Sequence, residues 1–286
     1  MGPVVASLKP LGGVVCSLRP FPDAATEKLH ISLFGEFRAW RDDFPIEQAA
    51  WKTQKTKALL KILLTHKGRL VLQDQIIEYL WPRLSTRDAK NSLWVCVNQL
   101  RRTLEPHLNR PSDSHFVISR SNGYLFDDAG LCTVDTHEFV AQIAEGDAYR
   151  SKGDLESAIA CYEYAIAIYS GDYLEEDLYA DWAINKRLEL QQAHCQLLRN
   201  LAECWAALGQ LNNALRYYQK ILSKERCRET IWREVMRCYW HLGERDQALL
   251  AYEECREILR RELRVQPLPP TLELREKIVG KASLSR

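Results

Sequence analysis

The chain has 286 residues, of which 46% are hydrophobic and 27% are charged, and its formal net charge is +1. This is the composition of a soluble globular protein with room for two domains. No stretch approaches the roughly 18 apolar residues of a membrane-spanning helix, so we expect no contact with a membrane. The nine cysteines include no CxxC pair, which favours reduced thiols and a cytoplasmic protein over a disulfide framework or a metal site.

The charges are divided unevenly along the chain. Residues 27–130 hold 16 Lys and Arg against 12 Asp and Glu, whereas residues 131–286 hold 21 against 25. This asymmetry is expected when one domain meets a polyanion and the other does not. Residues 1–26 contain four prolines and no apolar run long enough for the core of a signal peptide, and we predict a flexible arm there.

Residues 27–130 show the pattern of a small α+β domain. The segment 29–46 alternates apolar and polar residues as a half-buried strand does, and Asp42-Asp43 suggests the turn of a hairpin or small meander. A first helix begins near Thr53, whose side chain can cap it, and Gly68 ends it. The elements predicted next are a short helix over 72–81, a long helix over 86–104 and two short strands within 115–126.

A sheet, three helices and a hairpin, in this order, is the layout of a winged helix-turn-helix. In that fold the third helix enters the major groove of DNA and the hairpin touches the adjoining backbone. Within the hairpin, Asn122 and Gly123 are expected to supply the positive φ angles of a tight turn. Tyr124 and Phe126 alternate with polar residues, and we expect them to pack in the core beneath the hairpin.

The helix predicted over 86–104 has two different sides. Apolar residues recur at steps of three and four, and this stripe is expected to face the core: Ala89, Leu93, Cys96, Val97, Leu100 and Leu104. The opposite side carries long cations and amides, whose donors and acceptors match base edges in the major groove. The predicted base-reading residues are Arg87, Asn91, Trp94, Asn98 and Arg102. An ordinary solvated helix face is the alternative interpretation.

Cations near this helix predict contacts to DNA phosphates. Three lysines surround the start of the first helix, where amide groups already point at incoming anions. Another cation precedes the turn of the hairpin. The predicted phosphate-binding residues are Lys52, Lys55, Lys57, Arg101 and Arg120. A basic, solvated helix end would explain the lysines equally well.

From Asp135 onward the pattern changes to repeated helices. A set of four small, apolar and aromatic residues returns after 34 positions, first as Leu208-Gly209, Ala214 and Tyr218, then as Leu242-Gly243, Ala248 and Tyr252. Gly153, Ala158 and Tyr162 have the same internal spacing. A 34-residue helix pair with Gly at the turn and Ala where helices approach is the signature of tetratricopeptide repeats. The Gly153 set lies 56 residues before the Gly209 set, so an insertion around residues 171–183 interrupts the array.

The helical region offers further candidates for binding, each with a structural alternative. Four tryptophans could line a peptide groove but are more often repeat core: Trp182, Trp205, Trp232 and Trp240. Three arginines could meet an acidic ligand, although ion pairs with Glu189, Glu229 or Glu234 explain them as well: Arg187, Arg228 and Arg233. No HExxH motif, nucleophile with a base or catalytic carboxylate pair occurs in the sequence, and we predict neither an enzyme nor a cofactor.

Together these residues resemble the Streptomyces antibiotic regulatory protein family, in which a winged helix of the response-regulator type is joined to a bacterial transcriptional activation domain. The resemblance covers about residues 29–279. Its motifs are KTKALLKILLTHKGRLV for the first helix, AKNSLWVCVNQLRRTLEP for the recognition helix, SNGYLF for the wing, VDTHEF for the start of the activation domain and RRELRVQPLPPTLEL for the closing helix. Trp94 and Cys96 depart from the small residues expected in such a recognition helix, which points to an unusual set of bases.

The resemblance implies a winged helix over 27–130, an all-α tetratricopeptide-like activation domain over 131–286, and a bacterial transcription regulator. Such a regulator binds double-stranded promoter DNA and, as an activator, contacts RNA polymerase. A protein-interaction scaffold with a degenerate winged helix is the rival interpretation, and Arg87, Arg101 and Arg102 argue against the neutral recognition face that it requires. The sequence leaves open whether two copies bind side by side and whether the protein represses.

Overall fold

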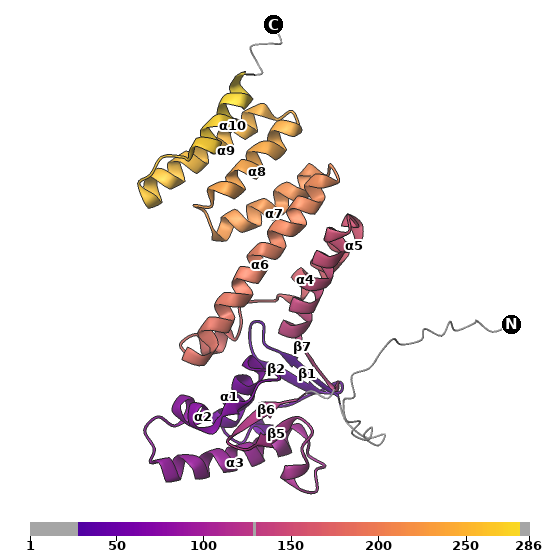
Figure 1. The fold of residues 1–286 in the computed structure, drawn as a ribbon, viewed down its shortest axis with the longest axis vertical. Helices are drawn as coiled ribbons and strands as arrows, with labels where there is room; N and C mark the ends of the chain where they lie inside the picture. The colour runs from indigo at the N-terminus through magenta and orange to yellow at the C-terminus, as the bar shows by residue number, and fades with distance from the viewer. Residues whose placement is uncertain (1–27, 128–129, 281–286) are drawn as a thin grey trace, which may run out of the picture.

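The computed structural model describes residues 28–127 and 130–280, so the arm predicted over residues 1–26 lies outside the described residues. Figure 1 shows an elongated molecule. Residues 28–134 form a part with strands and helices at one end, the front part, and residues 135–280 form a second part, a stack of helices that leads away from it to the C-terminal end. No helix in the described ranges is both long and apolar enough to span a membrane.

The front part begins with a four-stranded sheet in the order β3-β2-β1-β7. Asp42, with φ at 50°, lies in the predicted turn between the second and third strands. The last strand runs parallel to the first, with Val134 opposite Ile31. This strand comes from beyond the predicted boundary at residue 130, so the second half of the chain completes the sheet of the first. The strands are β1 (Leu29–Ser32), β2 (Arg38–Arg41), β3 (Phe44–Pro45) and β7 (Cys132–Val134).

Three helices and a smaller sheet complete a winged helix-turn-helix, as predicted. The hydroxyl of Thr53 accepts a hydrogen bond from Thr56 N at 3.1 Å and so caps the first helix, as expected. Ser85 caps the third helix by accepting a bond from Asp88 N at 3.2 Å. The helices are α1 (Gln54–Thr65), α2 (Gln73–Leu80) and α3 (Thr86–Leu104), and the sheet has the order β4-β6-β5, from β4 (Val71–Leu72), β6 (Gly123–Phe126) and β5 (Val117–Arg120).

The hairpin of β5 and β6 differs from the prediction at its turn. Neither Asn122 nor Gly123 has a positive φ, so that expectation was wrong. Gly123 is needed for another reason: a Cβ there would lie 2.3 Å from the carbonyl oxygen of Val71 in β4. The absence of a side chain lets the two strands pair. Tyr124 and Phe126 are buried, which confirms their predicted place in the core.

The second part is an array of antiparallel helix pairs that follows the predicted repeats. Gly153, Gly209 and Gly243 all have φ between 75° and 82°, a conformation that favours glycine, and each lies between the two helices of a pair. The predicted alanines and tyrosines are buried in all three repeats. The pairs are α4 (Asp135–Ser151) with α5 (Leu155–Ile168), α6 (Asp181–Ala207) with α7 (Leu211–Lys224), and α8 (Glu229–His241) with α9 (Arg245–Ile258), followed by a π-helical turn η4 (Leu259–Leu263) and α10 (Pro269–Gly280).

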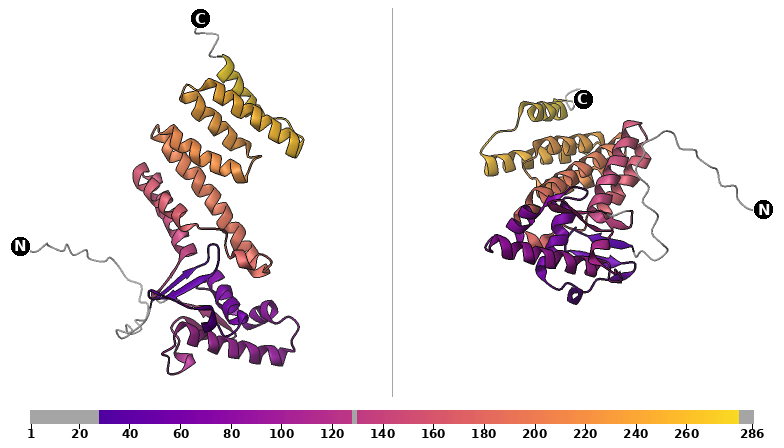
Figure 2. Two further views of the ribbon diagram at one scale, coloured as in Figure 1. Left: turned by 180° about the vertical axis from the view of Figure 1, so that it is seen from behind. Right: turned by 60° about the horizontal axis from the view of Figure 1, so that its bottom comes forward.

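The insertion between α5 and α6 turns back onto the front part. Tyr173 forms an antiparallel bridge with Phe34, and Leu174 N donates to Leu33 O at 2.8 Å. A short helix, η3 (Glu175–Asp177), then faces α1. Figure 2 shows from behind that the start of α6 lies beside the front part. The interruption of the repeat pattern in the sequence is therefore the segment that joins the two parts.

Candidate nucleic-acid interface

The helix α3 lies at the end of the molecule that is farthest from the C-terminal helices (Figure 1). Its predicted apolar stripe packs inward, and every member of it is buried: Ala89, Leu93, Cys96, Val97, Leu100 and Leu104. The stripe packs against α1 and α2. Because the repeats lie on the opposite side of the front part, they leave the outer side of this helix uncovered.

The outer side of α3 presents the predicted base-reading residues to solvent. Arg87, Asn91, Trp94 and Arg102 are exposed, and Asn98 is partly exposed. Within the described part of the chain, neither Arg87 nor Arg102 has an acidic partner. The acidic residue at the start of this helix is Asp88, whose carboxylate accepts a hydrogen bond from Ser85 Oγ at 2.6 Å. The face is therefore cationic and free to meet an anion.

Lys90 belongs to the same surface but was missed in the sequence. It is exposed and lies one turn of helix after Arg87 and one before Trp94, so its side chain emerges beside theirs. The two-sided pattern of the helix could have revealed it, because Lys90 stands at none of the apolar positions. With Arg87 and Arg102, its ammonium group makes three exposed cations on this helix.

Three of the predicted phosphate contacts have a suitable position. Lys52 and Lys55 are exposed at the start of α1, and Lys55 Nζ lies 4.8 Å from the ring centre of Trp81. Arg120 is exposed at the end of β5, directly before the turn of the hairpin. These three remain predictions, because their exposure fits a solvated cation as well as a phosphate contact.

Arg101 does not fit the predicted phosphate contact, and that prediction was wrong. Its side chain is buried, and the guanidinium donates to the carbonyl oxygen of Val117 from Nε at 3.0 Å and from Nη2 at 2.8 Å. A third bond reaches Ser119 Oγ at 2.9 Å. Burial lowers the pKa of Arg101, with the charge of nearby groups acting against it. The residue joins α3 to the first strand of the hairpin.

Lys57 requires a second correction. Its side chain is only 12% exposed, and Nζ lies 3.3 Å from Glu176 Oε1 in η3. The ammonium group is therefore neutralised by the second part of the molecule and turned away from the DNA-facing side. The residues around Lys57 in the sequence gave no sign of this ion pair, because its partner is 119 residues away.

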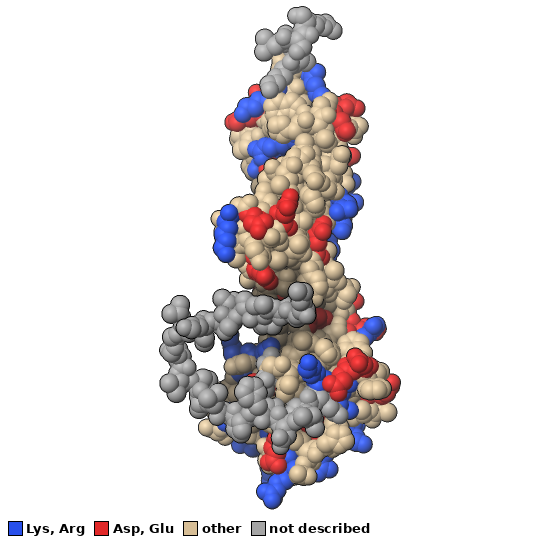
Figure 3. Space-filling view, turned by 90° about the vertical axis from the view of Figure 1, so that its right-hand side faces the viewer, with Lys and Arg blue, Asp and Glu red and all other residues tan. Residues whose placement is uncertain are grey.

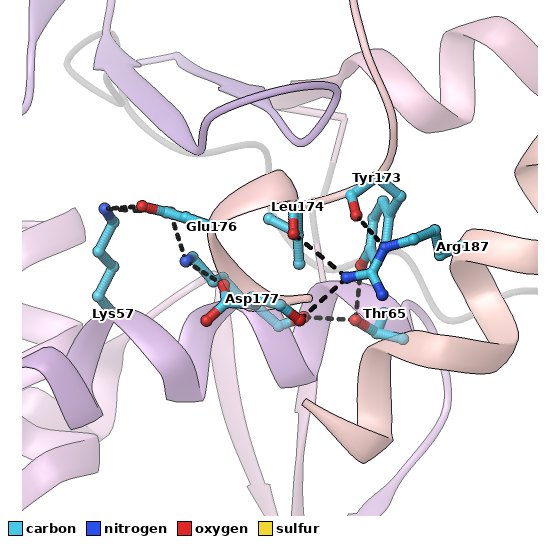
Figure 4. A network of polar contacts seen from close by, with 8 residues as sticks. Lys57, Thr65, Tyr173, Leu174, Glu176, Asp177 and Arg187 are labelled. Atoms are coloured by element: carbon cyan, nitrogen blue, oxygen red, sulfur yellow. Dashed lines mark hydrogen bonds and ion pairs between the residues drawn. The ribbon is translucent and has the colours of Figure 1, made fainter. Parts of the chain in front are cut away.

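Figure 4 labels Lys57, Glu176 and Asp177 in this contact, which also includes a buried lysine that was missed in the sequence. Lys61 Nζ lies 2.5 Å from both Glu176 Oε1 and Asp177 Oδ2. One turn further along α1, Thr65 Oγ1 lies 2.6 Å from Tyr173 OH. The sequence did hold a signal for this buried lysine, because it lies between Leu60 and Ile62 in an otherwise apolar run.

Arg187 holds the insertion in shape and is not open to an acidic ligand. It is buried, and its guanidinium donates to four backbone carbonyls of the insertion, among them Tyr173 O at 2.8 Å and Asp177 O at 3.0 Å. The predicted ligand role was therefore wrong for this residue. Glu189, the alternative partner considered for it, pairs with Lys186 instead.

The other candidates of the helical region mostly follow their structural alternatives. Trp232 is buried, and its Nε1 donates to Arg226 O at 2.8 Å. Arg233 lies 4.0 Å from Glu229, and Arg228 lies 2.6 Å from Glu225 rather than from the glutamates first considered. Trp182, Trp205 and Trp240 are partly buried and pack against the core.

The surface charges agree with a division of roles between the two parts. Figure 3 shows Lys and Arg at the lower tip of the molecule, which is the winged-helix end, with some acidic side chains above them, while acidic and basic side chains mix over the helical part. In the two described ranges, no group of three or more His, Cys, Asp and Glu is arranged to hold a metal ion.

Two family models match the chain. The bacterial transcriptional activator domain matches residues 134–279, and the C-terminal domain of transcriptional regulatory proteins matches residues 47–126. The first covers the helical repeats and the second covers the winged helix from the start of α1 to the end of β6. Their order along the chain is the one that the sequence motifs predicted.

Curated relatives are named as regulators. The chain is 25% identical to the regulatory protein AfsR of Streptomyces coelicolor over 91% of its own length, and it spans only 25% of that relative. It is also 25% identical to the transcriptional regulatory protein MoaR1 of Mycobacterium tuberculosis, over 79% of this chain and 72% of that one. The structure of Mycobacterium tuberculosis EmbR in complex with a low-affinity phosphopeptide has the same fold, with a TM-score of 0.77 at 22% identity over 89% of this chain and 66% of that one.

Proposed function

Since the chain belongs to the Streptomyces antibiotic regulatory protein family of DNA-binding transcriptional regulators, we propose that it activates transcription by binding promoter DNA through α3. The observation that carries this proposal is the uncovered outer side of that helix, where Arg87 and Arg102 are exposed and form no ion pair with a described residue. Long cations and amides are the side chains that pair with base edges in the major groove.

Each predicted contact has a separate task in this mechanism. Lys52 and Lys55 at the start of α1, with Arg120 beside the turn of the hairpin, contact phosphates and set the position of the protein on the duplex. The outer side of α3 then lies in the major groove and distinguishes bases. The base-reading residues are Arg87, Asn91, Trp94, Asn98 and Arg102.

The helical repeats are proposed to supply the contact to RNA polymerase. Stacked helix pairs present a long surface suited to a protein partner, and their acidic balance disfavours DNA. The insertion fixes this array relative to the winged helix, so a partner bound to the repeats would be held at a set place beside the promoter. We further propose that the protein acts in the cytoplasm, without a catalytic activity, and that two copies can bind side by side on DNA.

The rival function, an interaction scaffold without DNA binding, requires a neutral recognition face. Arg87 and Arg102 are both exposed, and neither has an acidic partner in the described residues. A helix that no longer bound DNA would not require exposed cations without ion pairs on its outer side. The exposed face thus favours the DNA-binding proposal.

Fluorescence anisotropy of the full chain on duplex DNA tests the proposal. Affinity should fall steeply with salt, because each phosphate contact releases about 0.9 of a counterion. Asn98→Ala and Arg102→Ala should each weaken binding to a selected site by about 1 to 3 kcal/mol and leave random DNA nearly unaffected. Lys152→Ala, an exposed cation of the helical part, is the matched control and should change neither. A binding constant indifferent to salt would contradict DNA binding.

A further inference from the structure

One large apolar side chain lies exposed among the polar residues on the outer side of α3. Trp94 is 65% exposed, and it is the only one of the eight tryptophans in the chain that lies open to solvent, all eight being among the described residues. Val95 beside it is 45% exposed. The exposure of large apolar side chains to water is unfavourable, and free energy is gained when a partner covers them.

The surroundings leave room for such a partner. A hollow of about 570 Å³ opens on one side of the helix, and Trp94, Val95, Asn98, Arg102, Pro111 and Ser112 line it. A second hollow of about 370 Å³ lies on the other side, between Val95, Asn91, Ser92 and the start of α1. Val95 borders both hollows and Trp94 lines the first, so the two side chains form an apolar ridge at the edge of the first hollow.

The major groove offers few groups that an apolar ridge can bind. Its base edges carry hydrogen-bond donors and acceptors, and the apolar group among them is the 5-methyl of thymine. Asn91 and Asn98 lie one turn before and one turn after Trp94 on the same side of the helix. Their amides have the paired donor and acceptor that adenine requires. In the proposed complex, the indole would lie over a base pair between those that the two asparagines reach.

We propose that Trp94, together with Val95, selects thymine in the bound DNA by covering its 5-methyl group. The inference rests on the proposed DNA binding and names the feature that this face recognises. The indole Nε1–H is a donor, which suits the O4 acceptor next to the methyl group of the same base. Cytosine at that position would present a donor and no methyl group, and the contact would be lost.

Binding-site selection with the full chain on randomised duplexes gives the DNA for the test. In the selected site, each thymine is then replaced in turn by deoxyuridine, which removes the methyl group and leaves every hydrogen-bonding group in place. At one or two positions the affinity of the unmodified protein should fall about fourfold, the loss expected for one buried methyl-sized group. Trp94→Ala should bind the thymine and uracil duplexes equally, since it lacks the covering ring.

Arg102→Ala is the matched control on the same helix. It should bind more weakly overall and keep the fourfold preference for thymine, because it leaves the indole in place. Since Trp94 is exposed, its replacement should leave the urea unfolding curve unchanged. If uracil is accepted as well as thymine at every position, or if Trp94→Ala keeps the preference, the inference is overturned while DNA binding stands. If selection enriches no sequence, the proposed function itself fails.

Discussion

The guanidinium of Arg101 donates two hydrogen bonds to the carbonyl oxygen of Val117, and it thereby ties the helix α3 to the hairpin beside it. Both elements are expected to meet DNA, and the bond fixes the angle between them. A cation that the sequence offered as a phosphate ligand thus acts inside the domain, where it satisfies a carbonyl of β5, the edge strand of the small sheet.

Arg101→Ala should therefore destabilise the winged helix rather than weaken its DNA contacts selectively. Loss of hydrogen bonds from a charged donor, with a buried carbonyl left behind, costs about 1.5 to 3 kcal/mol. Urea unfolding of the full chain measures this loss. Arg102→Ala, next in sequence but exposed, should change the free energy of unfolding by less than about 0.5 kcal/mol. Equal stability of the two variants would show that the buried bonds contribute nothing.

The fold could be predicted further from the sequence than the site could. The stripe of α3 and the Gly, Ala and Tyr of the repeats are local patterns, set by the 3.6-residue period of a helix and by the turns that need glycine. Residues such as Arg101 and Lys57 take their roles from partners that the chain brings close only after folding. A cation near a predicted DNA-binding helix looks the same in sequence whether it faces phosphate or a buried carbonyl.

Lys55 and Lys57, both in the first turn of α1, should differ in their effect on DNA binding. Lys55 is exposed, and its replacement by alanine should lower the slope of log affinity against log salt by about 0.9, the share of one phosphate contact. Lys57→Ala should leave the slope unchanged, because Glu176 already neutralises that ammonium group. Titrations at four salt concentrations give both slopes. A lower slope for Lys57→Ala would return this residue to the DNA surface.

Acid should weaken the contact between α1 and the insertion. Burial raises the pKa of Glu176, but the hydrogen bond and charge of Lys61, aided by Lys57, outweigh it and hold the pKa below its ordinary value of 4.5. A carboxylate whose pKa is depressed by folding stabilises the folded form fully above its unfolded pKa, and the contribution is lost as the pH falls through the folded pKa. The protection of the amides of residues 172–178 against hydrogen exchange, relative to the intrinsic rate at each pH, should therefore fall below about pH 4.5.

Lys61→Met tests the origin of this pH dependence. Without the ammonium group of Lys61, only Lys57 opposes the effect of burial, and the pKa of Glu176 should rise toward or above its ordinary value. The variant should protect these amides less at neutral pH and lose little further protection on acidification below pH 4.5. Lys186→Met removes a surface ion pair with Glu189 and should behave as the unmodified protein does. An unchanged acid response in Lys61→Met would assign the effect to other carboxylates.

Because of strand β7, the boundary between the two parts lies after residue 134 and not at the predicted residue 130. It pairs with β1, and directly after it the carboxylate of Asp135 accepts hydrogen bonds from Leu33 N at 2.9 Å, Phe34 N at 3.0 Å and Ser32 Oγ at 2.8 Å. A fragment of residues 28–138 should therefore be more stable than one of residues 28–130. Hydrogen bonds to a charged acceptor contribute about 1.5 to 3 kcal/mol, less the cost of the burial that raises the pKa of Asp135.

Urea unfolding of the two fragments beside the full chain checks this order. Asp135→Ala in the longer fragment should remove most of its advantage, because β7 would remain without the carboxylate that anchors the loop after β1. Both fragments should remain less stable than the full chain, since each lacks the insertion that supplies the partners of Lys61 and covers Phe34. If the fragment ending at residue 130 were as stable as the full chain, the winged helix would fold independently, and the contact with the insertion would serve only to orient the repeats.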